Sequence, residues 1–337
     1  MRFQEYTEKN LRWIENNPKR RVLYRKETKI FPNDPCSGEN PPYGACIHYY
    51  LKTEPKGDVV IAILDENGQT MRTLKTEKTE DLELDNFSRQ HTKPFKVPKN
   101  AGINRIWWDL RHDRTKLIKL RTPPLGHDHV RVGPRGWRPF PRGSRSRGPL
   151  VPPGVYTVKL TVGDRKVTQK LVVKKDPHSS GTEADIQAQT KIMLDIHRKM
   201  DSVADLINQV ELIRKQIDDL EDLLNETEKM QPVIKAADAL EKKLIDIESF
   251  FFTLEVTGSG DGLRWPDKFY VKLRFLANDI GKSDFPPTCQ QLKVHEMFTK
   301  QLAEYEGRFH DLVAHDVSAF NSLLEENGIL NIITDRD

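Results

Sequence analysis

The spacing of hydrophobic and polar residues changes once along the chain, close to residue 176. Before that point apolar residues alternate with polar ones or form short apolar runs, and both patterns are typical of β-strands. Asn67-Gly68 between two such runs predicts a tight hairpin, because both turn positions need positive φ. Several short strands separated by turn residues predict an antiparallel sandwich. The expected strands are 45–51, 59–64, 71–74, 103–110, 155–162 and 167–173.

After Asp176-Pro177 the apolar residues follow the three-four spacing of an amphipathic helix. Thr182 and Asp185 form a capping box that begins a helix over about 183–226, which would be about 65 Å long at a rise of about 1.5 Å per residue. Its apolar residues form one narrow stripe between charged faces, so we expect a partner along that seam. The stripe consists of Met193, Ile196, Met200, Val203, Ile207, Val210, Ile217, Leu220 and Leu224.

Further helices follow, and their ends carry recognisable signals. Pro232 suits the first position of a helix, and Thr288 with Gln291 forms a second capping box. Gly328 is a natural helix end. The expected helices are 234–252, 267–279 and 288–326. Two long helices and two shorter ones predict an antiparallel bundle.

A chain of 337 residues is longer than one ordinary core supports, so we expect two domains. The predicted fold class is α+β multidomain, with an antiparallel Ig-like β-sandwich followed by an antiparallel long-helix bundle. The N-terminal linker segment covers 1–35, and the sandwich covers 36–176 with an Arg/Pro/Gly-rich loop at about 123–150. The helical bundle covers 177–337.

The composition of the chain limits which classes of partner it could bind. Charged residues make up 31% of the chain and almost cancel to a net charge of +4, so binding of nucleic acid would have to rest on a local patch. Cys36, Cys46 and Cys289 are widely spaced and predict neither a zinc site nor a disulfide framework. A bridge between Cys36 and Cys46 in an exported protein and three thiols without a bridge are equally consistent with this spacing.

The chain carries no apolar run of the roughly 20 residues that span a bilayer. Its first residues lack the charged and then apolar pattern of a signal peptide. Taken literally, this predicts a protein that crosses no membrane and stays where it is made. Its compartment and oligomeric state remain open, and if residue 1 is not the natural start, the prediction about export loses its basis.

Two short motifs suggest ligands but lack the required context. His127-Asp128-His129 supplies imidazole and carboxylate groups, yet it lies in a Pro-rich stretch with no third partner fixed by spacing. Gly281-Lys282-Ser283 resembles the end of a phosphate-binding loop, but the required first glycine would fall at Leu276. We therefore expect a helix end at Gly281 and assign no metal or cofactor.

A basic stretch is the one candidate for binding nucleic acid. No acidic residue occurs between His129 and Gly163, and aromatic rings are interleaved with the arginines. Guanidinium groups beside aromatic rings are what single-stranded nucleic acids stack on. The alternative is an ordinary loop between two strands, either solvated or folded back over the sheet. The residues are Arg131, Arg135, Trp137, Arg138, Phe140, Arg142, Arg145 and Arg147.

No constellation for hydrolysis emerges from the sequence. Glu83, Asp109 and Asp113 are carboxylates near the expected strands, but nothing places two of them across a cleft as a glycosidase requires. The nucleophile motif G-x-S-x-G does not occur. We therefore assign no catalytic residue and do not expect an enzyme.

Several stretches nevertheless resemble a known family. They contain the turn Asn40-Pro41-Pro42-Tyr43-Gly44, an Asn-Arg-x-x-Trp-Asp strand at 104–109 and a Pro-Gly-x-Tyr-Thr-Val strand at 153–158. The chain is similar to the C-terminal region of bacterial BNR/sortilin-like β-propeller proteins, often labelled glycosyl hydrolases. The strands also match the Ig-like domain of the flagellar hook-capping type. The resemblance spans about 30–330 and is carried by 40–45, 60–68, 102–111, 121–124, 151–158, 174–177 and 182–189.

The chain departs from that family in one respect. The family places a large propeller with Asp-box turns before this region, whereas here the nearest match, over 259–266, has Leu263 where glycine is needed and Pro266 where tryptophan is needed. Residues that the family owes to its propeller therefore have no counterpart, and its hydrolase label does not transfer.

The favoured interpretation is a non-catalytic accessory or interaction module whose partner is a β-propeller, in the same gene product or in another chain. The aromatic N-terminal segment with Trp13 would contribute to the docking surface. The alternative is a component of a glycan-acting hydrolase, and nucleic-acid binding through the basic loop ranks third. The candidate interaction residues are Trp13, Arg135, Trp137, Arg138 and Arg142.

Overall fold

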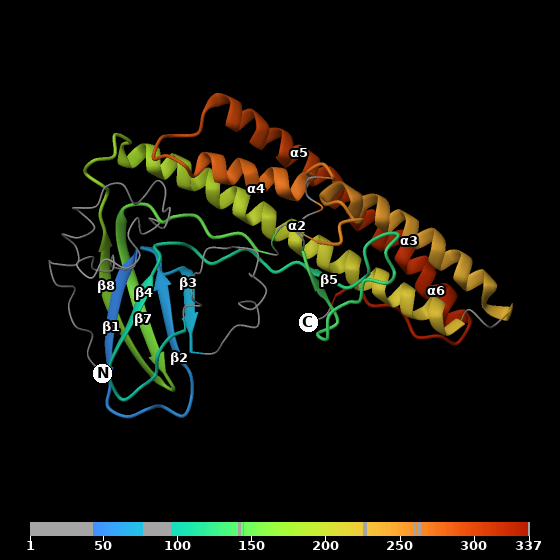
Figure 1. Cartoon of the computed structure of the whole chain (residues 1–337), viewed down its shortest axis with the longest axis horizontal. Coiled ribbons are helices and arrows are strands. Elements are labelled where there is room, and N and C mark those ends of the chain that lie inside the picture. The colour runs from blue at the N-terminus through green and yellow to red at the C-terminus, as the bar shows by residue number, and fades with distance from the viewer. Residues whose placement is uncertain are drawn as a thin grey trace, which may run out of the picture.

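The computed structural model describes residues 43–76, 96–140, 143, 145–224, 228–258, 261 and 264–335. The strands β1, β2, β3, β4, β7 and β8 gather at one end of an elongated molecule, which we call the sheet end, and a helical arm extends from them (Figure 1). The predictions for Trp13, Cys36, Glu83 and Arg142 lie outside the described residues.

The larger sheets are antiparallel, as the period of two predicts. One has the order β3 (Thr70–Lys75), β2 (Val59–Leu64), β7 (Gly154–Val162) and β8 (Arg165–Val173), and the other pairs β1 (Ala45–Leu51) with β4 (Gly102–Trp108). Inward side chains of both sheets share one hydrophobic cluster, in which Tyr49, Ile61 and Trp108 are buried. The Ig-like assignment stays a prediction.

Two glycines explain local features of the sheets. Gly68 has a φ of +78° in the turn between β2 and β3, where Asp65 Oδ1 accepts hydrogen bonds from the backbone amides of Asn67 and Gln69. The hairpin predicted at Asn67-Gly68 is confirmed, but its turn differs from the expected one, because Gly68 has a positive φ and Asn67 does not. Gly44 precedes β1 with a φ of +119°, and a Cβ atom there would lie 2.0 Å from the carbonyl oxygen of Trp108. Only glycine fits this approach of the chain to β4.

The helical arm contains the helices expected from the three-four spacing. They are α2 (Glu183–Leu224), α3 (Gln231–Phe251), α4 (Phe269–Ile280), α5 (Cys289–Leu312) and α6 (Ser318–Glu326). Both capping boxes are confirmed, since Thr182 and Asp185 exchange hydrogen bonds, as do Thr288 and Gln291. The arrangement as an antiparallel bundle remains a finer prediction.

The last helix differs from the expected uninterrupted one because Val313–Val317 forms a π-helical turn between α5 and α6. The buried apolar residues show why. Leu312 and Val317 are five positions apart, whereas Phe320 and Leu324 follow at spacings of three and four. The wider π turn accommodates the spacing of five and keeps all four side chains directed at the core.

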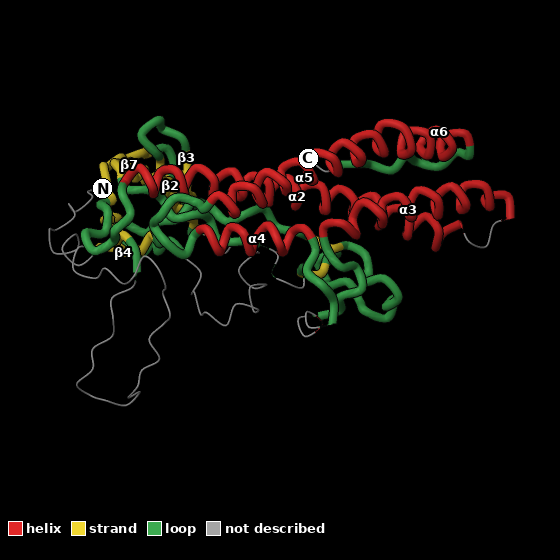
Figure 2. The backbone as a smooth tube through the Cα atoms, turned by 90° about the horizontal axis from the view of Figure 1, so that it is seen from above, coloured by secondary structure: helices red, strands yellow, loops and turns green. Residues whose placement is uncertain are grey.

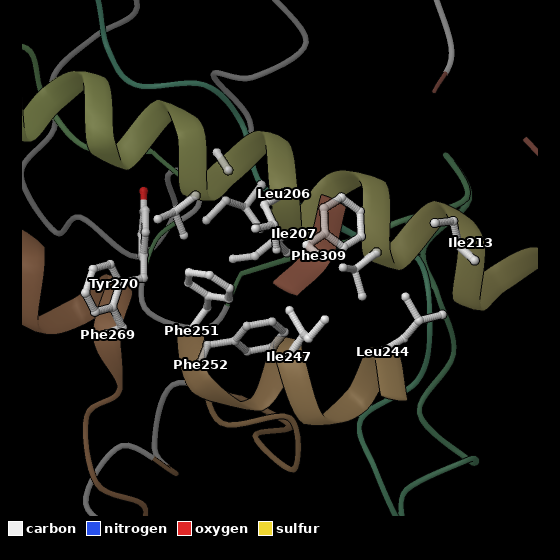
Figure 3. Packing of buried hydrophobic residues seen from close by; sticks show 14 of the residues in the cluster. Leu206, Ile207, Ile213, Leu244, Ile247, Phe251, Phe252, Phe269, Tyr270 and Phe309 are labelled. Carbon is white, nitrogen blue, oxygen red and sulfur yellow. The ribbon is translucent and has the colours of Figure 1, made fainter. Parts of the chain in front are cut away.

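The helices share a second hydrophobic cluster. Phe251 and Phe252 at the end of α3 meet Ile207 of α2 and Phe309 of α5 (Figure 3). Aromatic rings pack edge to face here, with centroids of Phe269 and Phe298 5.4 Å apart. Such pairs add about 0.5–1.5 kcal/mol beyond the burial of area.

The long connection from β4 to β7 takes an unexpected path. Instead of folding over the sheet or into solvent, it runs along α2 and forms a small hairpin from β5 (Lys119–Leu120) and β6 (Arg138–Pro139). This hairpin lies midway along the helices, apart from the larger sheets (Figure 2). Its side chains Ile118, Leu120 and Phe140 belong to the hydrophobic cluster of the helices. The division into domains at residue 176 stays a prediction, but the helical core includes residues from before that point.

Candidate functional site: the polar ladder on helix α2

One face of α2 carries polar side chains that hold the connection between β4 and β7. They are spaced by four, four, three and three residues, which places them above one another on the helix. Each contacts the extended segment 113–122. We call this set the polar ladder; it consists of His197, Asp201, Asp205, Asn208 and Glu211.

The first rungs bind the start of the segment. His197 Nε2 lies 3.0 Å from the carbonyl oxygen of Asp113. Asp201 Oδ1 accepts a hydrogen bond of 2.7 Å from the backbone amide of Lys116. The ammonium group of Lys116 also donates to Asp205 Oδ2 at 2.5 Å, but both side chains are about half exposed, so this ion pair adds little stability.

Asn208 binds the segment as a neighbouring strand would. Its Oδ1 accepts from the backbone amide of Lys119 at 2.8 Å, and its Nδ2 donates to the carbonyl oxygen of Leu117 at 2.8 Å. A single side-chain amide thus satisfies one donor and one acceptor of the backbone. Because backbone groups buried without partners cost free energy, this pairing allows the segment to lie against a helix.

Glu211 forms the last rung and is completely buried. Its carboxylate accepts hydrogen bonds from the backbone amides of Arg121 and Thr122, at 2.5 Å and 2.8 Å. The hydroxyl group of Thr122 also donates to it, at 3.1 Å. A carboxylate with three donors is a strong acceptor, because hydrogen bonds to an ionised group are about twice as strong as neutral ones.

A buried group of charges continues from Glu211 into the next turn. Arg214 Nη1 lies 2.8 Å from Glu248 Oε2 on α3, and Nη2 lies 3.2 Å from Glu241 Oε1. From the hairpin side, Arg138 Nε donates to the carbonyl oxygen of Thr122 at 2.8 Å. Burial lowers the pKa of Arg138, while the neighbouring glutamates act against that shift. The hairpin is therefore bound to Glu211 of α2 through Arg121 and Thr122, and its Arg138 interacts electrostatically with Glu211 of α2 and Glu248 of α3.

The other end of the segment is attached to the sheet end. The backbone amide of Asp113 donates to the carbonyl oxygen of Met71 in β3, at 2.8 Å. Arg72 Nη1 lies 3.3 Å from the carbonyl oxygen of His112 and 3.4 Å from Asp113 Oδ1. Burial is the main reason why the pKa of His112 is lowered to about 4, and the charge of His197 on α2 lowers it further. Residues 112 and 113 thus join β3 to the first rung of the ladder.

This arrangement positions backbone and pairs charges. The carboxylates of the ladder accept from amides, hydroxyl groups and cations, so their chemistry here is that of anchoring. Within the described ranges, no group of three or more His, Cys, Asp or Glu side chains could hold a metal ion.

The structure buries two of the predicted interaction residues. Trp137 is 9% exposed and Arg138 is 8% exposed, so neither offers a face to an incoming base. The exposed Arg135 lies over the ring of Trp137, with its guanidinium carbon 4.9 Å from the ring centroid, and Lys119 Nζ lies 5.8 Å from that centroid. Arg135 thus already stacks on Trp137 within the chain, and the roles of Arg135, Trp137 and Arg138 in binding a partner stay predictions.

The remaining motifs have local roles. The rings of His127 and His129 lie 5.8 Å apart in a turn that Val130 N closes on the carbonyl oxygen of His127. Gly281 ends α4, as expected, with its amide bound to the carbonyl oxygen of Ala277. Cys46 is buried and forms no disulfide with a described residue, and burial raises the pKa of its thiol to about 11.

Sequence reasoning missed the polar ladder. The apolar stripe indicates one buried seam on α2, and His197 or Asp205 reads as part of a solvated charged face. In the structure α2 is buried more widely, and even Glu211 and Arg214 are inaccessible. The one local signal was the spacing of four, four, three and three itself, because it aligns five polar residues on a single face.

No helix in the described part of the chain combines the length and the apolar character that a membrane span needs. A comparison of the chain with protein-family models, with curated proteins and with solved structures finds no match.

Proposed function

We propose that this chain is a non-catalytic interaction module, in which an Ig-like sandwich is held in a fixed orientation on a bundle of long helices. We further propose that it is the C-terminal part of, or a partner to, a BNR/sortilin-like β-propeller protein. The polar ladder is the observation that carries the proposal. It fixes residues 112–122 to β3 at one end and to α2 along their length. A connection fixed in this way keeps the sandwich in one orientation relative to the helices.

Apolar pairs on the outer surface of the sheets support a docking role for the sheet end. Tyr50 lies opposite Ile103 in the pairing of β1 with β4, and the side chain of Ile103 is 74% exposed. Val155 lies opposite Val172 in the pairing of β7 with β8, and both are exposed. Exposed apolar groups at neighbouring positions are common where proteins bind one another.

Binding to a co-expressed β-propeller of the BNR/sortilin type tests the partner. We expect the substitution Ile103→Ser to weaken binding at least tenfold, because a central apolar contact commonly contributes 1–2 kcal/mol or more. The matched control is Leu330→Ser in the C-terminal tail, where the side chain is 90% exposed. Absence of binding to the propeller, or equal loss in both variants, contradicts this partner.

Trp13→Ala extends the test to the N-terminal segment. A weaker complex with an unchanged melting temperature of the isolated chain supports docking through this residue. A large drop in melting temperature with binding intact assigns Trp13 to the internal core.

Turnover of a chromogenic glycoside that is lost when one acidic residue is substituted would favour the alternative of a hydrolase component.

Spin labels test the fixed orientation independently of any partner. Thr168 on β8 and Leu223 near the end of α2 are exposed, and each can be replaced by a labelled cysteine after serine has replaced the native cysteines. We expect one narrow distance distribution between the labels. The double substitution Asn208→Ala and Glu211→Ala should broaden it, whereas Gln187→Ala, at an exposed position of α2, should not. A broad distribution in the unaltered ladder would contradict the proposal.

A further inference from the structure

Two fully buried carboxyl groups face one another where the β5–β6 hairpin meets α2 and α3. Glu211 comes from α2 and Glu248 from α3, and neither has any exposed side-chain surface. Arg214 Nη1 lies between them, 2.8 Å from Glu248 Oε2 and 3.9 Å from Glu211 Oε1. Two ionised carboxylates that share one guanidinium group away from water repel each other strongly.

The hydrogen bonds around the two groups are unequal. Glu211 accepts from two backbone amides and from the hydroxyl group of Thr122, which suits an ionised carboxylate. Among the described residues only Arg214 donates to Glu248, and no donor reaches its Oε1. The carboxyl group of Glu211 is within hydrogen-bond reach of Glu248, so the two groups can share one proton. A buried charge that is so poorly satisfied is expensive, whereas a neutral carboxylic acid in the same place is not.

The balance of charges around Glu248 also favours its neutral form. Arg138 and Arg214 bring two positive charges to the cluster from β6 and α2. Glu211 and the partly exposed Glu241 of α3 match them with two negative charges. A third carboxylate at Glu248 would leave the buried group with a net negative charge.

We propose that Glu248 is a neutral acid in the folded protein, and that its proton, shared with Glu211, latches the β5–β6 hairpin onto the helices. Loss of this proton places a second negative charge beside the carboxylate that holds the amides of Arg121 and Thr122. The hairpin is then released from α2 while the larger sheets stay paired. The attachment of the β5–β6 hairpin to the helices therefore depends on this proton.

The direction of the pH dependence follows from this arrangement. Burial is the main cause that raises the pKa of Glu248 well above 4.5, and the charge of Glu211 raises it further. In the unfolded chain the same group loses its proton near its ordinary pKa. The folded state therefore holds more protons above about pH 4.5, and the folding equilibrium constant falls by up to about tenfold per pH unit from this group.

Urea unfolding of the full chain between about pH 5.5 and 8 tests the proposal. The variant Glu248→Gln keeps the shape and a hydrogen-bond donor but cannot ionise. We expect the ratio of its folding equilibrium constant to that of the unaltered protein to rise by up to about tenfold per pH unit. Gln187→Ala, at an exposed position of α2 that carries no ionisable group, is the control, and its ratio should stay constant with pH. A constant ratio for Glu248→Gln overturns the proposal, whatever its absolute value.

Two measurements on the unaltered chain cover the case in which the variant does not fold. Burial is the main cause that raises the pKa of Glu221 to about 7, so the carboxyl signals have to be assigned to single residues. Carbon NMR at pH 7 should show the carboxyl group assigned to Glu248 in the neutral form, and an ionised Glu248 would overturn the assignment. Amide exchange, corrected for its intrinsic pH dependence, should show the protection of Thr122 falling as the pH rises, while the amides of β7 stay protected. Unchanged protection of Thr122 through the ionisation of Glu248 would overturn the latch.

Discussion

Glu211 of α2 binds Thr122 through both its backbone and its side chain, although the two residues are 89 positions apart. The backbone amide of Thr122 lies 2.8 Å from Glu211 Oε2, and its hydroxyl group lies 3.1 Å from the same oxygen. Both residues are buried, so water does not replace these hydrogen bonds. This contact, more than any other on the ladder, fixes where the long connection between the sheets meets the helices.

Removal of the Glu211 carboxylate should therefore destabilise the folded protein strongly. Glu211→Ala leaves two backbone amides without their acceptor and Arg214 without one of its balancing charges. We expect the free energy of unfolding to fall by about 3–5 kcal/mol, as for other buried groups that lose a charged partner. Urea unfolding near pH 7 measures the effect. Thr122→Ser keeps the amide and the hydroxyl group and should cost less than about 1.5 kcal/mol; equal losses in the two variants would contradict the role of Glu211.

Phe140 should stabilise the helices although it belongs to the connection between two strands. Its ring centroid lies 5.1 Å from that of Phe252 and 5.3 Å from that of Tyr270. Phe140→Ala should cost about 3–5 kcal/mol and lower the temperature at which the helical circular dichroism signal is lost. Leu330→Ala removes an apolar side chain that is 90% exposed and should change stability by no more than about 0.5 kcal/mol. Helices that melt unchanged in Phe140→Ala would show that the connection is not part of their core.

His112 should make the joint between β3 and α2 sensitive to acid. Its folded pKa is lowered to about 4 from an ordinary value of 6.5, by burial first and then by His197, with Asp65 acting in the opposite direction. The unfolded chain therefore binds a proton that the folded chain does not. Its contribution to stability is fully present above pH 6.5 and is lost as the pH falls towards 4, at up to about tenfold in the folding equilibrium constant per pH unit.

His112→Gln should remove this part of the pH dependence. Urea unfolding of the variant and of the unaltered chain, compared between about pH 4.5 and 7, gives the difference directly. The carboxyl group of Glu248 does not affect the comparison, since it is the same in both proteins. If the two proteins lose stability in parallel on acidification, His112 is not the titrating group.

Gly44 should tolerate no side chain. Its φ of +119° disfavours any L-residue, and a Cβ atom would lie 2.0 Å from the carbonyl oxygen of Trp108. Gly44→Ala should cost about 3 kcal/mol or more, because both backbone strain and a shift of β4 are needed. Gly57→Ala is the control, since a Cβ atom there would meet nothing within 4 Å. Thermal unfolding of both variants measures the difference, and a stable Gly44→Ala protein would contradict the predicted clash.

Local sequence signals predicted the elements well where each signal acts within a few residues. The hairpin at Asn67-Gly68, the two capping boxes and the helix end at Gly281 all occur as expected, because a turn or a cap needs only its own neighbours. The π turn after Leu312 was missed, since the spacing of five that it accommodates looks like an ordinary gap in an apolar stripe. The Ig-like, bundle and propeller assignments stay predictions.

The sequence by itself determined which residues form strands, which form helices, and where most of these elements begin and end. Only the tertiary structure decided the path of residues 111–140, the burial of Trp137 and Arg138, and the polar ladder. The physical reason is the range of the interactions. Asn208 and Glu211 satisfy backbone groups about 90 positions away, and no local pattern distinguishes a carboxylate that faces water from one that faces an amide of a distant segment.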